Sequence, residues 1–250
     1  MTKQNGSVDT DFFNSYEDAK RADAYAKLKF SGTYYLAYRD LPEIIFDHVK
    51  GRRVIDFGCG TGRSTRFLHK LGFTDTIGID IAEDMIKKAR QLNPKGDYRL
   101  IKSGDFSQFT ENTFDLVLSV FTFDNIPTMV EKVKILREIG RLLKNEGRLI
   151  NLVSTPEIYV NEWVSFSTKD FPENKSVKSG DKVKIIITDL EDKRPVEDVL
   201  WKDKDYKEAY KRAGLELIKF YKPLAKEHKP YEWVNETRIA PWIIYVLKRR

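Results

Sequence analysis

Short apolar runs alternate with amphipathic stretches through the middle of the chain. The runs predict five strands, at residues 53–56, 76–80, 98–101, 114–120 and 147–153. Apolar residues at helical spacing predict helices between them, at residues 64–68, 82–92 and 128–144. Because strands that alternate with helices form parallel sheets covered on both faces, this part of the chain is predicted to be α/β.

Both flanks of this core follow a different pattern. The tyrosine-rich leading segment is helical in pattern over residues 11–30, breaks at Ser31-Gly32 and resumes after Pro42. Two interpretations of it stay open: helices that pack on the sheet, or a lid over a ligand. Beyond residue 153 the alternation breaks over residues 154–197, which we interpret as an insertion. The remaining pattern predicts one helix and two strands, at residues 203–213, 215–221 and 241–247.

The composition is that of a globular protein. The chain has 250 residues and a hydrophobic fraction of 41%, which is enough for one sizeable core. No apolar run approaches the roughly 20 residues of a membrane span, and the polar N-terminus lacks the apolar centre of a signal peptide. The single cysteine, Cys59, excludes an internal disulfide framework and a cysteine-cluster metal site. These features favour a cytoplasmic protein without a membrane partner.

The net charge of +6 is compatible with nucleic-acid binding, but its distribution is not. Lysines and acidic residues alternate along most of the chain, and only Lys248-Arg249-Arg250 forms an unbroken basic run. A mixed, solvated surface follows from this pattern. We therefore expect no nucleic-acid partner, while the oligomeric state stays open.

One glycine-rich turn follows the first predicted strand. Asp56 ends that strand, and Gly58, Gly60 and Gly62 follow at alternate positions before the next predicted helix. Glycines are needed where a turn takes unusual backbone angles or where a ligand approaches the main chain. A dinucleotide fingerprint would need glycine in place of Arg63, and no Gly-Lys-Ser/Thr follows as in a P-loop. The turn instead resembles the first motif of the class I S-adenosylmethionine (SAM) dependent methyltransferases, in particular their small-molecule, type 11-like branch.

The resemblance extends from Arg53 to Val153 in motif order, spacing and strand pattern. It implies a doubly wound, mostly parallel seven-stranded sheet of Rossmann-like type, with an antiparallel last strand. Residues 1–50 would form an N-terminal helical cap or lid. Residues 51–250 would form the SAM-binding domain, with the insertion at about 154–197. The resemblance also implies SAM as cofactor and S-adenosylhomocysteine as product.

Ligands of open parallel sheets lie beyond the carboxyl ends of the strands. By the resemblance, Asp80 accepts hydrogen bonds from ribose hydroxyls, Asp105 and Phe106 meet the adenine, and Met85 packs against it. The residues alone leave other roles open: a helix cap for Asp80, an Asx turn for Asp105 and plain core for Met85. The predicted cofactor-binding residues are Asp56, Gly58, Cys59, Gly60, Asp80, Ile81, Met85, Asp105, Phe106 and Val120.

The substrate is expected beside the same strand ends. In similar enzymes the loop that corresponds to residues 121–127 borders the transferred methyl group, although Ile126 departs from the pattern of the enzymes that methylate DNA amino groups. The loop before the last strand must emerge at the cofactor end of the sheet, since that strand is antiparallel. His228 in this loop is the candidate general base, with a surface histidine as the alternative. The predicted substrate contacts are Tyr16, Tyr35, Phe123, Asp124, Tyr231 and Trp233, with Tyr34 in the same aromatic pocket.

We therefore predict a methyltransferase that acts on an oxygen or nitrogen atom of a small molecule. Two alternatives stay open: an RNA or protein methyltransferase on the same fold, and a SAM-binding protein without catalysis. Three scattered histidines and one cysteine support no zinc site, and no metal is predicted. The sequence determines neither the acceptor atom nor whether a base is used.

Overall fold

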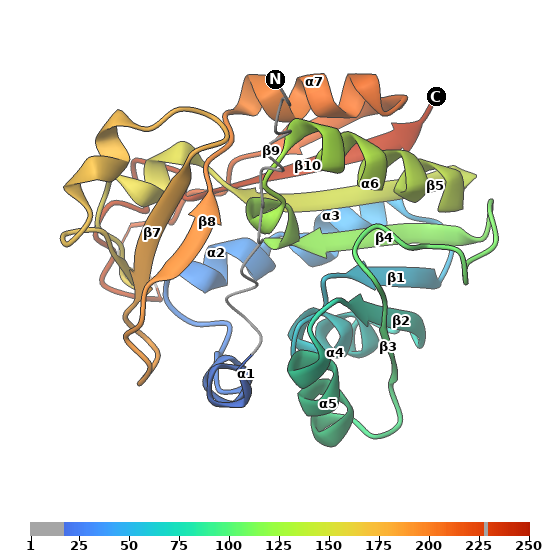
Figure 1. Ribbon diagram of the computed structural model, residues 1–250, viewed down its shortest axis with the longest axis horizontal. Helices are drawn as coiled ribbons and strands as arrows, with labels where there is room; N and C mark the ends of the chain where they lie inside the picture. The colour runs from blue at the N-terminus through green and yellow to red at the C-terminus, as the bar shows by residue number, and fades with distance from the viewer. Residues whose placement is uncertain (1–17, 228–229) are drawn as a thin grey trace, which may run out of the picture.

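The computed structural model describes residues 18–227 and 230–250, and a seven-stranded sheet forms its centre (Figure 1). The strands lie in the order β3-β2-β1-β4-β5-β10-β9. Their bounds are Arg53–Phe57 (β1), Asp75–Asp80 (β2), Asp97–Leu100 (β3), Phe114–Val120 (β4), Leu143–Ser154 (β5), Leu215–Tyr221 (β9) and Trp242–Arg249 (β10). The first five strands pair in parallel, whereas β10 is antiparallel to both of its neighbours. The predicted sheet with its antiparallel last strand is confirmed.

The strand order reverses at β1, which pairs with β2 on one side and with β4 on the other. From β1 the chain continues to β2 and β3 on one side of the sheet, and it then returns to β4 and β5 on the other side of β1. In an open parallel sheet this reversal creates a crevice at the carboxyl ends of the strands, where ligands bind. The glycine-rich turn lies directly there, because it follows the last residue of β1.

Helices cover both faces of the sheet because successive strand residues point to opposite sides. Val54 of β1 lies in one apolar cluster with Leu41 and Leu68, while Ile55 lies in another with Ile139 and Tyr210. The first face is covered by α2 (Thr33–Arg39), α3 (Leu41–His48) and α4 (Arg63–Lys70). The second is covered by α6 (Met129–Leu142) and α7 (Asp203–Arg212), and α5 (Glu83–Leu92) packs beside β2 and β3.

The chain between β5 and α7 forms a small second sheet. Its strands β6 (Phe166–Ser167), β7 (Lys182–Ile187) and β8 (Val196–Val199) pair antiparallel in this order. Two 3-10 turns precede β6 and β7: η2 (Pro156–Tyr159) and η3 (Pro172–Ser176). In Figure 1 the β7–β8 hairpin stands at the end of the large sheet opposite the C-terminus. The three strands β6, β7 and β8 lie within or at the end of the segment 154–197 that the sequence indicated as an insertion.

The leading segment divides into two parts that pack differently. In α2 and α3, Leu36, Ala37, Leu41 and Ile45 are fully buried, so these helices are a permanent layer on the sheet. The first described helix is α1 (Ala19–Ala26), shorter than the predicted helix over residues 11–30, of which residues 11–17 lie outside the described range. Only two of its side chains, Arg21 and Ala22, are buried.

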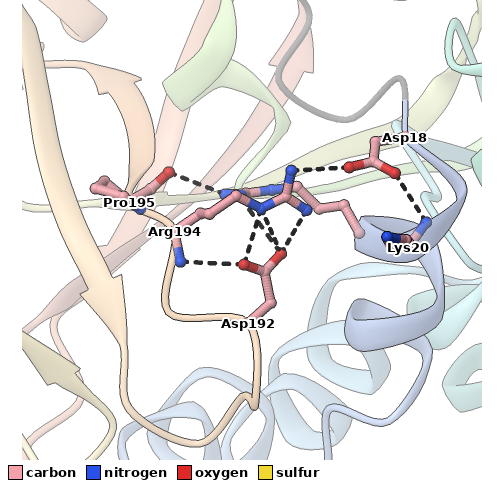
Figure 2. A network of polar contacts seen from close by, with 6 residues as sticks. Asp18, Lys20, Asp192, Arg194 and Pro195 are labelled. Carbon is pink, nitrogen blue, oxygen red and sulfur yellow. Dashed lines mark hydrogen bonds and ion pairs between the residues drawn. The ribbon is translucent and has the colours of Figure 1, made fainter.

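Helix α1 connects α5 to the tip of the β7–β8 hairpin. On one side, Lys88 of α5 lies 2.6 Å from Asp23. On the other, the Arg194 guanidinium lies between the carboxylates of Asp18 and Asp192, at 2.8 Å and 2.7 Å (Figure 2). Exposed ion pairs of this kind each contribute about 0–1 kcal/mol. The helix is therefore held to its neighbours more weakly than α2 or α3.

Across the described ranges, none of the helices combines the length and the apolar character that a membrane crossing requires.

Candidate functional site

A cavity of about 470 Å³ lies at the carboxyl ends of β1, β2, β4 and β5. Its walls include the last residues of these strands, Phe57, Asp80, Val120 and Ser154. The glycine turn and the start of α5 form one end of it. Side chains of α1, α2, the small sheet and β10 form the other end. Cavities of about 300–1,000 Å³ are the usual size for small-molecule sites.

The glycine turn brings main chain to the cavity surface. Gly58 and Gly60 have φ angles of +71° and +52°, which favour glycine. A side chain at Gly58 would collide with Thr122, 2.1 Å away, whereas one at Gly60 would meet no atom within 4 Å. Gly60 thus faces open space in which a ligand can approach the backbone. Gly58, Cys59 and Gly60, which are predicted to bind the cofactor, line the cavity.

Asp56, which precedes this turn, is hydrogen-bonded to the helix that follows it. Its side chain is fully buried, and Oδ2 accepts hydrogen bonds from Ser64 Oγ at 2.7 Å and Thr65 Oγ1 at 2.6 Å. Oδ1 is buried without a hydrogen-bond partner among the described residues. Burial raises the pKa of Asp56 to about 6. Asp56 is not among the described residues that line the cavity, so the structure gives it the role of positioning the start of α4 in place of the predicted cofactor contact.

Asp80 connects the turn to the end of β2. Its Oδ2 accepts from the Gly60 N–H at 2.8 Å, and its Oδ1 accepts from the Ala82 N–H at 2.9 Å. The N-cap residue of α5 is Ala82, so Asp80 does not occupy the cap position that was its alternative. Each carboxylate oxygen keeps a further lone pair for a ligand hydroxyl. Asp80, Ile81 and Met85 all line the cavity.

The predicted adenine contacts after β3 lie elsewhere. Asp105 is exposed, and its Oδ1 accepts from Ser107 N and Oγ at 3.0 Å and 2.7 Å, which is the Asx-turn alternative. Phe106 is buried below the cavity wall, its ring centroid 5.8 Å from that of Phe57. Neither residue lines the cavity. Ile101, Ser103 and Gly104 form this part of the wall, and contact of Asp105 and Phe106 with the adenine stays a prediction.

The segment after β4 forms a 3-10 turn, η1 (Thr122–Asn125), at the centre of the cavity. Val120 and Asp124 line the cavity as predicted, together with Phe121 and Thr122. Phe123 does not, because its ring is fully buried against Phe57 on the other side of the turn. Within the turn, Thr122, Asp124 and Asn125 therefore line the cavity, and Phe123 packs in the core.

Asp124 is 3% exposed and accepts two hydrogen bonds. The Ser154 N–H donates to Oδ2 at 3.0 Å, and Tyr206 Oη donates to Oδ1 at 3.1 Å. Burial raises the pKa of this carboxyl. Lys132 of α6 lies nearby, fully buried, with its Nζ donating to the Phe123 carbonyl. Burial lowers the pKa of Lys132.

Sequence reasoning missed a second carboxylate at the cavity. Asp198 of β8 is 9% exposed, lines the cavity and accepts a hydrogen bond from Tyr159 Oη at 3.0 Å. Burial raises the pKa of Asp198, and the charge of Asp124 raises it further. No motif surrounds it in the sequence. The local indication of a buried strand is Val196 together with the apolar run from Val199 to Trp201 in an otherwise polar stretch.

Aromatic side chains from distant segments line the end of the cavity away from the glycine turn, which we call the acceptor end. They are Tyr25, Tyr34, Tyr38, Phe121, Tyr159, Phe166 and Trp242. Arg63 adds a cation that the sequence analysis did not select. Its guanidinium lies 4.7 Å from the Tyr34 ring centroid and 5.4 Å from that of Tyr38.

The other predicted aromatic residues gather outside the cavity. Tyr35 packs against Tyr231 and Trp233, with ring centroids 5.8 Å and 6.5 Å away, and none of the three lines the cavity. The reason is helical periodicity: Tyr34 and Tyr38 share one face of α2, and Tyr35 projects from another. The predicted pocket roles of these three residues are corrected accordingly. Tyr16 and His228 lie outside the described residues.

The cofactor end of the cavity fits SAM. Gly60 leaves room for a ligand against the main chain, and Asp80 offers lone pairs to a ribose. Arg63 Nη1 is buried without a hydrogen-bond partner among the described residues, beside the turn, and suits the carboxylate of the methionine part. Ile81 and Met85 add apolar surface to this end of the cavity. Within the described ranges, no cluster of three His, Cys, Asp or Glu side chains could hold a metal ion.

Comparisons with known proteins agree with this geometry. Residues 55–151 match the family described as "Methyltransferase domain". The chain is 30% identical over 123 residues to the eEF1A lysine and N-terminal methyltransferase of Mus musculus, covering 48% of this chain and 18% of that protein. It is 29% identical over 202 residues to an uncharacterised protein of Methanocaldococcus jannaschii, covering 80% of this chain and 74% of that protein.

A solved structure of a SAM-dependent methyltransferase from Clostridium acetobutylicum shares the fold. It aligns with a TM-score of 0.61 and 15% identity over 90% of this chain and 94% of that one. Since this chain spans only 18% of the mouse protein, the similarity to that protein concerns one domain of it. Residues 55–151 thus resemble the methyltransferase domain family in sequence, and the chain shares the fold of a solved SAM-dependent methyltransferase.

Proposed function

We propose that this protein transfers the methyl group of SAM to an oxygen or nitrogen atom of a small molecule bound in the cavity. One observation carries the proposal: a single cavity runs from the glycine turn to an aromatic wall. A mostly apolar cavity with a few placed polar groups is typical of small-molecule sites. Side chains from three separate segments of the chain line its acceptor end: Tyr34, Phe166 and Trp242.

The residues of the chain would mainly align and enclose the reactants. SAM supplies an activated methyl group on a sulfonium sulfur. The turn, Asp80 and Arg63 hold the cofactor end, and the aromatic wall holds an acceptor and excludes water. Holding two reactants in the productive geometry contributes about 7–11 kcal/mol to lowering a barrier. A hydroxyl or protonated amine acceptor also needs a base, and Asp124 and Asp198 are carboxylates at the cavity with raised pKa values.

Hydrogen exchange should show that α1 closes over the bound cofactor. We expect residues 19–26 to gain protection when S-adenosylhomocysteine binds, because α1 buries few side chains and contacts the cavity through Tyr25. The peptides of α2 and α3 should be protected equally with and without ligand, since Leu36 and Leu41 are fully buried. Equal protection of α1 in both states would show that it is a permanent packing layer.

A protein substrate is the second candidate, favoured by the mouse relative that acts on eEF1A. A lysine side chain would then have to enter the cavity from outside. The position of α1 between α5 and the β7–β8 hairpin argues for a small molecule, because α1 would have to move away from both to admit a protein segment.

Labelled methyl transfer separates the two candidates. The protein would be incubated with methyl-tritiated SAM and a cell extract divided by ultrafiltration into small molecules and macromolecules. We expect label in the small-molecule fraction, and none with the variant Asp80→Ala, which should not hold the cofactor. Label that moves only into the macromolecule fraction would support protein or RNA methylation. Binding of SAM with no transfer into either fraction would indicate a SAM-binding protein without catalysis.

A further inference from the structure

Two carboxylates lie at the acceptor end of the cavity, and they differ in their partners. Asp124 has a hydrogen bond on each oxygen, from Ser154 N–H and Tyr206 Oη. Asp198 accepts one hydrogen bond from the described residues, which Tyr159 Oη donates to Oδ2. Within the described part of the chain, neither carboxylate forms an ion pair with a lysine, arginine or histidine. The cavity therefore holds more acceptor capacity than its own donors use.

The buried cations that act on Asp198 through space already have partners. Lys132 Nζ donates to the Phe123 carbonyl. Arg21 Nη2 donates to the Pro195 carbonyl at 3.1 Å, and Nη1 lies 3.8 Å from Asp192. Neither cation is within hydrogen-bonding distance of Asp198.

An ionised Asp198 is therefore unfavourable without a ligand. A carboxylate that is 9% exposed loses most of its hydration, and Asp124 adds a second negative charge nearby. Both effects favour the protonated form, which is why its pKa is raised. A cation placed against Asp198 would reverse this, because a buried charge is stable when it is paired.

The aromatic wall of the same cavity suits such a cation. Tyr34, Phe166, Trp242 and Phe121 form a chain of rings, with successive centroids 5.1 Å, 5.7 Å and 4.6 Å apart. All four line the same cavity as Asp198. Aromatic faces attract ammonium groups, most strongly where water is excluded.

We propose that the acceptor end of the cavity binds the protonated amine group of a small aromatic or apolar amine, with Asp198 as its counter-ion. This inference rests on the proposed function and narrows the acceptor to nitrogen. The ammonium N–H bond then breaks as its proton passes to the Asp198 carboxylate, forming an O–H bond there. The electron pair of that N–H bond stays on nitrogen, which becomes the nucleophile for the methyl group.

A matched pair of ligands tests the subsite without any turnover. Phenethylamine and 2-phenylethanol share one body and differ in the charged group. Calorimetry would measure their binding to protein saturated with S-adenosylhomocysteine. We expect the amine to bind about ten to a hundred times more tightly than the alcohol, the usual range for a hydrogen bond to a charged group.

Two variants of neighbouring residues locate the effect. Asp198→Asn removes the charge and keeps an oxygen for the Tyr159 hydroxyl, so amine affinity should fall to that of the alcohol. Glu197→Gln is the matched control, because Glu197 lies next along β8 but pairs with Lys182 at 2.6 Å. The preference of the Glu197→Gln variant for the amine over the alcohol should equal that of the wild type. The affinity of each variant for S-adenosylhomocysteine reports whether the fold is intact.

Three outcomes would overturn the inference. The wild type could bind both ligands equally, Asp198→Asn could keep the preference for the amine, or neither ligand could bind at millimolar concentration to protein that binds S-adenosylhomocysteine. Each is distinguishable from failure of the proposed function, which would appear as no methyl transfer to any small molecule.

Discussion

Replacing Asp80 by alanine is expected to weaken the binding of S-adenosylhomocysteine by about a hundredfold or more. Two ribose hydroxyls donating to one carboxylate lose about 1.5–3 kcal/mol each when that charged acceptor is removed. Asp80 also accepts hydrogen bonds from Gly60 N–H and Ala82 N–H, so its removal frees the turn that surrounds the ligand. Isothermal calorimetry with S-adenosylhomocysteine measures the change directly.

Asp105→Ala is the matched control for this prediction. Asp105 also follows a parallel strand of the same sheet, but its carboxylate accepts from Ser107 at the surface and does not line the cavity. We expect its variant to bind S-adenosylhomocysteine within about threefold of the wild type. Thermal unfolding would confirm that both variants are folded. If the two variants lost affinity equally, the cavity would not be the cofactor site as described.

The variant Asp56→Asn is expected to change how stability depends on pH. Burial raises the pKa of Asp56 from 3.8 to about 6, so the native protein binds a proton that the unfolded chain has already released. The wild type therefore loses stability as pH rises through this interval and stays level above it. A shift of roughly two units corresponds to about 3 kcal/mol. Asp56→Asn has no carboxyl group at this position, so its stability should not fall in this way as pH rises.

Urea unfolding without ligand, from about pH 4 to about pH 7, would measure the difference. The stability of the wild type should fall by about 3 kcal/mol relative to Asp56→Asn over that range. Asp115→Asn should behave in the opposite sense and at lower pH. The hydrogen bonds of Asp115 to Lys144 and the Arg53 N–H lower its pKa below 3.8, so the wild type gains stability over that variant only as pH rises to about 4. From there to about pH 7 the curves of the wild type and Asp115→Asn should run parallel. If the stability of the wild type and of Asp56→Asn depended on pH in the same way, the pKa of Asp56 would not be raised in the folded protein.

Local patterns were sufficient to predict the sheet and the turn. Each central strand is a short apolar run with its own boundaries, and the parallel order follows from the helices between the runs. The turn at Gly58 to Gly62 needs glycines because of its own backbone angles, which neighbours in sequence dictate. Asp80 could be placed because it is the last residue of a strand whose end lies beside the turn. These features depend on residues close together in the chain.

Side-chain direction limited the prediction near the site. Asp105 and Phe106 follow a strand end as Asp80 does, but one turns outward to Ser107 and the other inward to Phe57. Tyr34 and Tyr35 are adjacent in the sequence, yet only Tyr34 reaches the cavity. A pattern that identifies an element does not specify which of its faces meets a ligand.

The acceptor end of the cavity was decided by tertiary structure alone. Tyr34, Asp198 and Trp242 come from segments separated by more than forty residues at each step, and no spacing in the sequence relates them. The Thr33 carbonyl accepts a hydrogen bond from Trp242 Nε1 at 3.1 Å, which fixes α2 against β10. Asp198 becomes a buried charge only because the small sheet folds onto the end of the large one. The sequence thus determined the glycine turn on which the proposed cofactor site depends, through local backbone chemistry, whereas long-range packing determined what surrounds the proposed acceptor.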